Sequence, residues 1–111
     1  MTLEISRKDS TVIIVLPHRF DSANALEIEA DMKKVLADEP QEVLLDLSQM
    51  EYIASAGIRV LLVVTRGVMK SGGKIAFASP HPRVQQIFDM GGFAKVFPLF
   101  ATKDGALSSF R

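Results

Sequence analysis

The strongest constraint on the fold is an apolar run followed by a long helical pattern and a second apolar run. Residues 42–47 (EVLLDL) have an unbroken Val-Leu-Leu centre, which is typical of a strand buried on both faces of a parallel sheet. Residues 55–71 are too long without proline for one strand, and their apolar residues recur with helical spacing. Residues 74–78 (KIAFA) predict another strand. A strand, a helix and a strand at this spacing form a parallel crossover.

The first third of the chain adds two strands and an amphipathic helix. Residues 11–16 (TVIIVL) predict a buried strand, and residues 3–6 predict a shorter strand that pairs with it through a polar turn. Asp21 and Ser22 are favoured N-cap types, and a helical pattern follows them. The apolar face of that helix comprises Ala25, Ile28, Met32, Val35 and Leu36. The residues expected on its other faces are Glu27, Glu29, Lys33 and Lys34.

The last third predicts a short helix, an edge strand and a closing helix. The short helix follows Ser79-Pro80 and ends at Gly91-Gly92, which act as a C-terminal stop. Residues 96–100 predict the edge strand, and the tail from Thr102 predicts the closing helix. No linker divides the chain, so we expect one α/β domain over residues 1–111, a mixed β-sheet with helices packed against it.

The composition excludes several classes of function. The chain has no cysteine, which removes disulfides and thiolate sites and fits a reducing cytoplasm. Its 13 Lys and Arg balance 13 Asp and Glu, so no basic excess is left for the phosphates of a nucleic acid. The longest apolar run, residues 60–64, is too short to cross a bilayer, and no signal peptide is readable. We therefore expect a cytoplasmic protein that binds neither nucleic acid nor membrane.

No catalytic or metal-binding set can be assembled from the sequence. His18 and His81 lack companions at metal-ligand spacing. The Ser71-Gly-Gly-Lys74 segment lacks the Walker spacing and leads into a strand instead of a helix. A Ser/His/Asp set or a pair of carboxylates cannot be argued either. The chain is therefore expected to act by protein–protein contact, without catalytic activity, cofactor or metal.

The most informative segment joins the strand at 42–47 to the helix at 55–71. It passes Tyr52-Ile53 and turns through Ala54-Ser55-Ala56-Gly57 into the helix. This loop resembles the signature of anti-sigma factor antagonists of the STAS family, in which an acidic-Leu-Ser run precedes a Ser-Ser/Ala-Gly-Leu turn. Two further segments resemble that family in the same order along the chain, namely Phe20-Asp21-Ser22-Ala23 and Ile87-Phe88-Asp89-Met90-Gly91-Gly92-Phe93.

The resemblance implies a partner-switching function. Family members bind, when unphosphorylated, an anti-sigma factor serine kinase that also sequesters a sigma factor. Binding frees the sigma factor, the kinase phosphorylates the loop serine, and a serine phosphatase reverses the modification. The phosphoacceptor maps onto Ser55, while Ala54 and Ala56 depart from the Asp or Ser that the family often has there. The partner-binding residues that the resemblance implies are Asp21, Ser22, Ala54, Ser55, Ala56, Gly57, Ile58 and Arg59.

Other interpretations of the loop stay open at this point. Ser is a favoured N-cap, so Ser55 could simply cap its helix, and Gly57 could be only a close-packing position. A phosphate at a helix N-terminus meets free N–H groups, so it is expected to obstruct a partner without unfolding the domain. The alternative function is a constitutive STAS subunit of a lipid-transporter or stress-sensing complex without a phosphoserine cycle. A nucleotide-dependent enzyme, weak nucleotide binding and a weak homodimer also stay open.

The helix at 55–71 carries an apolar strip that core packing does not explain. Its expected buried face comprises Ile58, Leu61, Leu62, Thr65, Val68 and Met69. With that face inward, Val60 and Val63 point outward, with Gly67 between them. Such a strip is typical of a contact surface, unless another element of the chain covers it.

Arg59 is the residue of a neighbouring basic ridge that lies nearest to Ser55. A positive charge so early in a helix opposes the helix dipole, and the i to i+4 spacing puts Arg59 on the face of Ser55. Arg59 is therefore expected to meet an acidic group of the partner or to fold back onto the phosphate. The alternative is a solvated arginine whose stem covers apolar surface. The other members of the ridge are Arg66 and Lys70.

Overall fold

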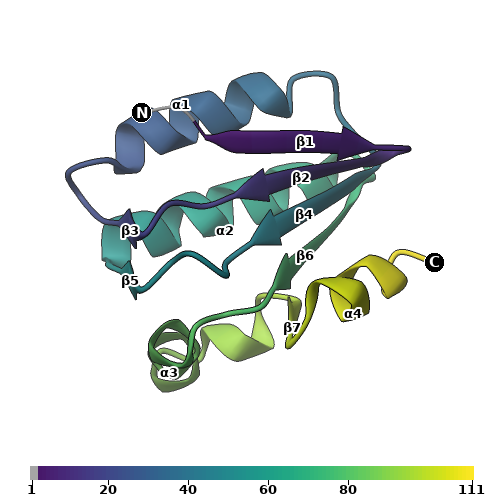
Figure 1. The fold of residues 1–111 in the computed structure, drawn as a ribbon. Coiled ribbons are helices and arrows are strands. Elements are labelled where there is room, and N and C mark those ends of the chain that lie inside the picture. The colour runs from purple at the N-terminus through teal and green to yellow at the C-terminus, as the bar shows by residue number, and fades with distance from the viewer. Residues whose placement is uncertain (1–2) are drawn as a thin grey trace.

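The sheet forms from the apolar runs of the sequence. In the computed structural model, which describes residues 3–111, five strands are ordered β1-β2-β4-β6-β7 (Figure 1). The strands are β1 (Glu4–Lys8), β2 (Thr11–Val15), β4 (Glu42–Asp46), β6 (Lys74–Ala78) and β7 (Leu99–Phe100). Strand β1 pairs antiparallel with β2, and the other neighbours pair in parallel. The predicted mixed sheet and its parallel crossover are confirmed.

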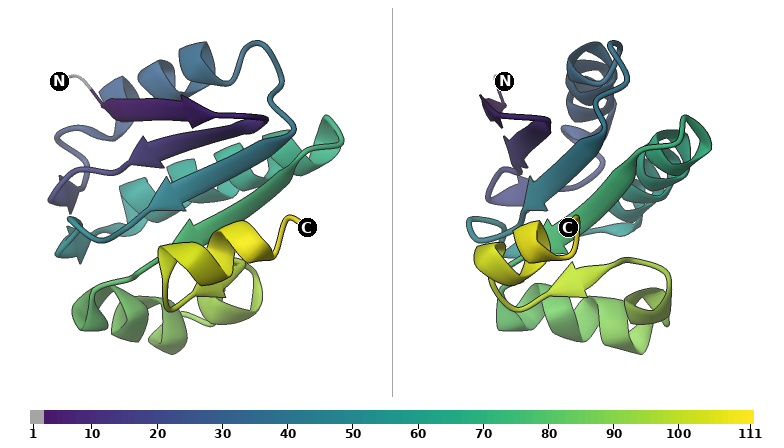
Figure 2. Two further views of the ribbon diagram at one scale, coloured as in Figure 1. Left: turned by 45° about the vertical axis from the view of Figure 1, so that its right-hand side comes forward. Right: turned by 90° about the vertical axis from the view of Figure 1, so that its right-hand side faces the viewer.

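Helices cover both faces of this sheet. They are α1 (Ala25–Val35), α2 (Ser55–Lys70), α3 (Pro82–Met90) and α4 (Lys103–Ser108). Helices α1 and α2 lie on one face, and α4 lies on the other (Figures 1 and 2). Successive residues of a strand point to opposite faces, so Leu45 joins the core under α1 and α2 while Leu44 joins the core under α4. No helix within residues 3–111 combines the length and the hydropathy that a bilayer span requires.

The edge strand is shorter than the predicted residues 96–100. The carbonyl oxygen of Phe93 accepts hydrogen bonds from the amides of Val96 and Phe97, so the chain turns there instead of extending. The Phe97 ring is buried and stacks on Phe77 with 4.8 Å between the ring centroids. Because this packing holds Phe97 in a turn, only Leu99–Phe100 remains free to pair with β6.

A second, two-stranded sheet lies beyond the carboxyl ends of β2 and β4. Its strands, β3 (Arg19–Phe20) and β5 (Tyr52–Ile53), run parallel, and Phe20 pairs with Ile53. The Ala54 amide also donates to the Phe20 carbonyl oxygen at 2.9 Å. The sequence does not predict these strands, because two residues are too few to show alternation. The small sheet holds the loop after Phe20 against the turn that begins α2.

Candidate functional site

Ser55 is the first residue of α2, and its side chain is exposed. The N-cap is Ala54, whose carbonyl oxygen accepts from the amides of Gly57 and Ile58, both at 3.0 Å. No side-chain hydrogen bond caps α2 within the part of the chain that the structure describes. The interpretation of Ser55 as the helix cap is therefore wrong, since Ser55 lies one residue inside the helix. Its hydroxyl group remains accessible from solvent.

The electrostatic surroundings of Ser55 favour an added negative charge. Among the first-turn amides of α2, the Gly57 amide already donates to the Ala54 carbonyl oxygen, which leaves the Ser55 and Ala56 amides for an added acceptor within the described chain, and the helix dipole is positive at this end. The first turn of α2 also contains no acidic side chain that would already occupy this position. A phosphate on Ser55 would meet these amides without needing any other part of the fold to move.

Gly57 is the point where the two loops approach most closely. A Cβ atom at Gly57 would lie 2.7 Å from the Phe20 carbonyl oxygen and 2.8 Å from the Phe20 Cγ atom. Real Cβ contacts are not this short, and the Phe20 backbone is held by β5, so only glycine fits without a shift. The predicted close-packing role of Gly57 is confirmed. This contact sets the position of the first turn of α2 relative to β3.

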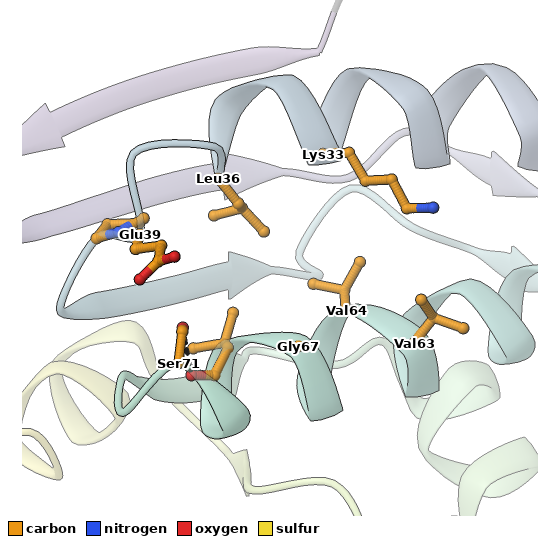
Figure 3. Close-up of a pocket in the computed structure, with 9 residues that line it drawn as sticks. Lys33, Leu36, Glu39, Val63, Val64, Gly67 and Ser71 are labelled. Carbon is orange, nitrogen blue, oxygen red and sulfur yellow. Dashed lines mark hydrogen bonds between the residues drawn. The ribbon is translucent and has the colours of Figure 1, made fainter.

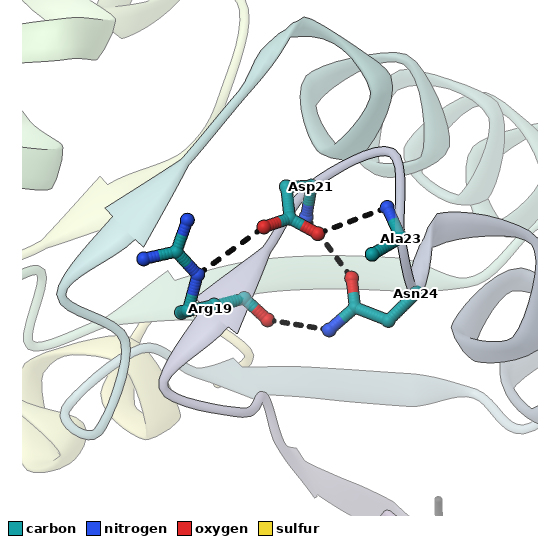
Figure 4. Close-up of polar contacts among 4 residues, drawn as sticks. All are labelled: Arg19, Asp21, Ala23 and Asn24. Atoms are coloured by element: carbon teal, nitrogen blue, oxygen red, sulfur yellow. Dashed lines mark hydrogen bonds and ion pairs between the residues drawn. The ribbon is translucent and has the colours of Figure 1, made fainter.

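The loop at Asp21 is held by its own polar contacts (Figure 4). The Asp21 carboxylate accepts from the Ala23 amide at 3.0 Å and from Arg19 Nε at 3.2 Å. The Asn24 side chain accepts from the Asp21 amide at 3.0 Å and donates to the Arg19 carbonyl oxygen at 2.8 Å. The N-cap of α1 is Asn24, so the prediction that Asp21 or Ser22 caps this helix is wrong. The Asp21 side chain instead closes a turn that precedes the helix.

The eight predicted partner-binding residues gather at one end of the molecule, but they differ in exposure. Ser22, Ser55 and Arg59 are exposed, while Asp21, Ala54 and Ala56 are half-buried. Gly57 and Ile58 are buried, so they can influence a partner only through packing. Among residues 3–111, no group of three or more His, Cys, Asp or Glu side chains could hold a metal ion.

Residues in the strands of the small sheet, and directly before them, form a rim beside the Asp21 loop that the sequence did not indicate. The Arg19 guanidinium lies 5.0 Å from the centroid of the Tyr52 ring, which is exposed. Next to this pair, His18 Nδ1 lies 3.1 Å from Glu51 Oε2. These four residues come together only because β3 pairs with β5. The four residues could have been grouped from the sequence only if the pairing of β3 with β5 had been recognised first.

Arg59 forms an ion pair with Glu29 that the sequence analysis missed. Its Nη2 atom lies 2.9 Å from Glu29 Oε1, and Lys33 Nζ lies 3.5 Å from Glu29 Oε2. The prediction that Glu29 lies on an outer face is wrong, because Glu29 is buried where α1 packs beside α2. The Arg59 hydrogen bond lowers the pKa of Glu29 below its ordinary value. The available signal was that Glu29 stands between Ala25 and Met32 of the apolar stripe.

The predicted outer strip of α2 is confirmed at Val63 and wrong at Val60. Val60 is fully buried, whereas 37% of the Val63 surface is exposed. Met69, which was expected in the core, is 63% exposed, and Val64 is buried in its place. The buried surface of α2 is wider than one stripe because the helix packs on both the sheet and α1.

Val63 lies in a groove between α1 and α2 (Figure 3). The groove has a volume of about 270 Å³. Its lining residues are Lys33, Leu36, Glu39, Pro40, Val63, Val64, Gly67, Val68 and Ser71. Lys33 of α1 and Leu36, the residue directly after α1, extend toward α2, so both helices contribute to the walls of the groove (Figure 3). Val63 therefore lines a groove that two helices share and does not stand on a strip of one helix, and its role as a contact surface stays a prediction.

Known proteins share both the sequence pattern and the fold of this chain. "Putative anti-sigma factor antagonist BtrV" of Bordetella bronchiseptica is 31% identical over 111 residues, which cover 100% of this chain and 96% of that protein. The crystal structure of an anti-sigma factor antagonist from Mycobacterium paratuberculosis superimposes with a TM-score of 0.89 and 26% identity, over 99% of this chain and 93% of that one. The phosphorylated form of the Bacillus cell fate determinant SpoIIAA matches with a TM-score of 0.73 and 18% identity, over 99% and 100%.

The extent of the match to a family model shows to which family the chain belongs. The STAS domain pattern covers residues 2–106, which include every strand of both sheets and the Ser55 turn. This chain therefore belongs to the STAS domain family.

Proposed function

We propose that this chain is an anti-sigma factor antagonist controlled by phosphorylation of Ser55. In its unphosphorylated form it binds an anti-sigma factor serine kinase in the cytoplasm, and phosphorylation ends that binding. The observation that carries the proposal is that Ser55 is exposed at the N-terminus of α2 and that its hydroxyl makes no capping hydrogen bond to the helix. Relatives that are named anti-sigma factor antagonists support the choice of partner.

The proposed modification is a phosphoryl transfer from ATP that the kinase holds. The Ser55 hydroxyl oxygen attacks the γ-phosphorus, the bond from that phosphorus to the β,γ-bridging oxygen breaks, and ADP leaves. The hydroxyl proton passes to a base of the kinase. A serine phosphatase later hydrolyses the ester, so that water supplies the oxygen of the released phosphate and the proton that restores the hydroxyl.

The proposed inactivation is local. A phosphate adds a charge of about −1.5 to −2 to the turn where the partner docks. It would repel acidic groups of the partner and would force a desolvation cost on any apolar group placed against it. Because the amides of the first turn can receive the phosphate, the domain is expected to keep its fold.

The test is phosphorylation by a cognate anti-sigma factor kinase, followed by intact mass and site mapping. One phosphate on Ser55 is expected. Ser55→Ala should take no phosphate and stay bound to the kinase, with an unfolding free energy within about 0.5 kcal/mol of the natural chain, because Ser55 makes no capping bond. Ser55→Asp should bind at least ten-fold more weakly, about 1.4 kcal/mol.

Ser48→Ala is the matched control. Ser48 is another exposed serine in the loop between β4 and β5, and its substitution should change neither phosphorylation nor binding. Thr65 is not a suitable control, because it is buried. Phosphate mapped to Ser48 would contradict the proposal. A chain that binds its partner but never takes a phosphate would indicate the constitutive subunit instead.

A further inference from the structure

The ion pair between Glu29 and Arg59 joins α1 to α2 one helical turn from Ser55. The two residues are thirty positions apart in the sequence, and their charged atoms lie 2.9 Å apart. The Glu29 side chain is only 12% exposed, whereas that of Arg59 is 53% exposed. The carboxylate is therefore fixed inside the helix pair, and the guanidinium remains at the surface.

Arg59 has a second anionic group within its range once Ser55 carries a phosphate. Residues four apart on a helix are neighbours on the same face, so the Arg59 side chain can reach the phosphate without a change in the backbone. The guanidinium has five N–H donors in a fixed fork, and both a carboxylate and a phosphate accept such a fork well. Glu29 and the phosphate would then compete for one cation.

We infer that Glu29 is a positioning residue for the Ser55 site. It holds Arg59 against α1 while Ser55 is unmodified, and it competes with the phosphate for Arg59 after modification. The inference rests on the proposed function, in which Ser55 is the phosphorylated residue. The Arg59 guanidinium thereby stays away from the unmodified Ser55 hydroxyl. After modification, the phosphate changes the contact between Arg59 and Glu29, and so affects α1.

Neither the Glu29 carboxylate nor the phosphate binds Arg59 to the exclusion of the other. Glu29 is mostly removed from water, and an unpaired buried carboxylate is unfavourable, which favours retaining Arg59 on Glu29. Lys33 would still contact Glu29 at 3.5 Å, which reduces that cost and lets Arg59 be shared. The phosphate carries more charge than the carboxylate, but it is exposed and screened by salt. Glu29 therefore tunes the phosphate, because it sets how much of Arg59 remains available.

The test measures the second pKa of a phosphoserine introduced at position 55 during translation, by phosphorus NMR. Four proteins are compared: the natural chain, Arg59→Gln, Glu29→Gln and the double variant. Arg59→Gln should raise the second pKa, with about a two-fold gain in proton affinity, the size expected of an exposed ion pair. Glu29→Gln should lower it, because Arg59 is then released to the phosphate. In the Arg59→Gln background, Glu29→Gln should have a clearly smaller effect.

The controls distinguish competition for Arg59 from a general effect of the protein's charge on the second pKa of the phosphoserine. Arg66→Gln removes an exposed cation of α2 that lies about 16 Å along the helix from Ser55, beyond the screening length of about 8–10 Å, so it should leave the second pKa unchanged. The inference is overturned if Glu29→Gln shifts the second pKa equally with and without Arg59, or if Arg59→Gln has no more effect than Arg66→Gln. Should Glu29→Gln fail to fold, Glu29→Asp takes its place in the comparison, because it keeps the charge but draws the carboxylate back from Arg59, and the Arg59 side-chain NMR signal must also move on phosphorylation.

The failure of this inference and the failure of the proposed function look different. The phosphate is installed without a kinase, so its pKa reports on Arg59 even if no kinase modifies Ser55. If a cognate kinase does phosphorylate Ser55 but the four pKa values are additive, the proposed function stands and the positioning role of Glu29 is wrong. If the kinase modifies another residue while the four pKa values are non-additive, the proposed function fails and the coupling of Glu29 to position 55 through Arg59 stands.

Discussion

The two halves of α2 are attached to the rest of the domain in different ways. The N-terminal half is tied to β3 by the close approach of Gly57 to Phe20 and to α1 by the ion pair of Arg59 with Glu29. The C-terminal half instead borders the groove between α1 and α2, where Val63 is exposed and a Cβ atom at Gly67 would meet nothing within 4 Å. One helix thus has a fixed end and an open end.

This difference matches two expectations for the helix, a modified residue at its start and an apolar contact surface farther along it. A residue to be modified must be presented to an enzyme in a defined position, and side chains locked by packing provide that definition. A docking surface needs accessible apolar area and tolerates more variation in shape. The contacts at Gly57 and Arg59 serve the first need, and the groove at Val63 and Gly67 offers the second.

The largest effect is expected where the two halves meet, at Val60 and Val63. Val60→Glu should lower the free energy of unfolding by about 4 kcal/mol, because it places a carboxylate in a fully buried position. Val63→Glu should change it by less than about 0.5 kcal/mol, since that side chain already reaches solvent. Urea unfolding of both variants measures the difference. Equal losses would show that the C-terminal half is as firmly packed as the N-terminal half.

Val63→Glu also tests the groove as a docking surface. If the partner contacts the groove, this variant should bind the kinase at least ten-fold more weakly, about 1.4 kcal/mol, while it remains folded. Unchanged kinase affinity would limit the docking surface to the fixed end of the helix.

A matched pair of glycines tests the same comparison through the backbone. Gly57→Ala should destabilise the domain by about 2 kcal/mol, because the new Cβ atom meets the Phe20 carbonyl oxygen at 2.7 Å and must displace it. Gly67→Ala should stabilise the domain by about 0.5 kcal/mol, since alanine is the better helix former and the space is open. Thermal unfolding of the two variants should therefore shift in opposite directions. A shift in the same direction would remove the distinction between the two ends.

The sequence predicted the parts of the fold that long apolar runs determine. Strand β4 and helix α2 agree with their predicted ranges within one residue, because a buried strand and a sixteen-residue helix each repeat their pattern several times. The helical phase within α2 was less certain. Residues 58–64 are apolar except for Arg59, so periodicity alone could not show that Val60 faces inward and Met69 outward.

The site was predicted by resemblance, and its geometry was not. Ser55 was located correctly at the start of a helix, but whether it is the cap or the first helical residue depends on a single backbone position. The pairing of β3 with β5 and the contact of Glu29 with Arg59 join residues about thirty positions apart. No local pattern encodes such contacts, because each joins two segments that are far apart in the sequence.

The Glu29 pair makes the fixed end of the helix sensitive to pH. Its carboxyl pKa is lowered in the folded chain, so the pair stabilises the domain fully above the ordinary value of 4.5 and loses this effect as the pH falls through the folded value. Glu29→Gln should therefore cost about 1 kcal/mol at pH 7, with much less difference from the natural chain under acid conditions. Urea unfolding at both pH values measures this.

The smallest effect concerns Thr65, a buried residue in the open half of α2. Its hydroxyl has no hydrogen-bond partner among residues 3–111, so replacing it by an apolar group of similar shape should stabilise the domain. Thr65→Val is expected to raise the free energy of unfolding by about 0.5 kcal/mol. Thr11→Val is the matched control, because the buried Thr11 hydroxyl donates to Glu42 at 2.6 Å, and its loss should cost about 1 kcal/mol. If Thr65→Val destabilises the domain as much as Thr11→Val, the Thr65 hydroxyl has a partner in solution, and the open half of α2 is as well satisfied as the fixed half.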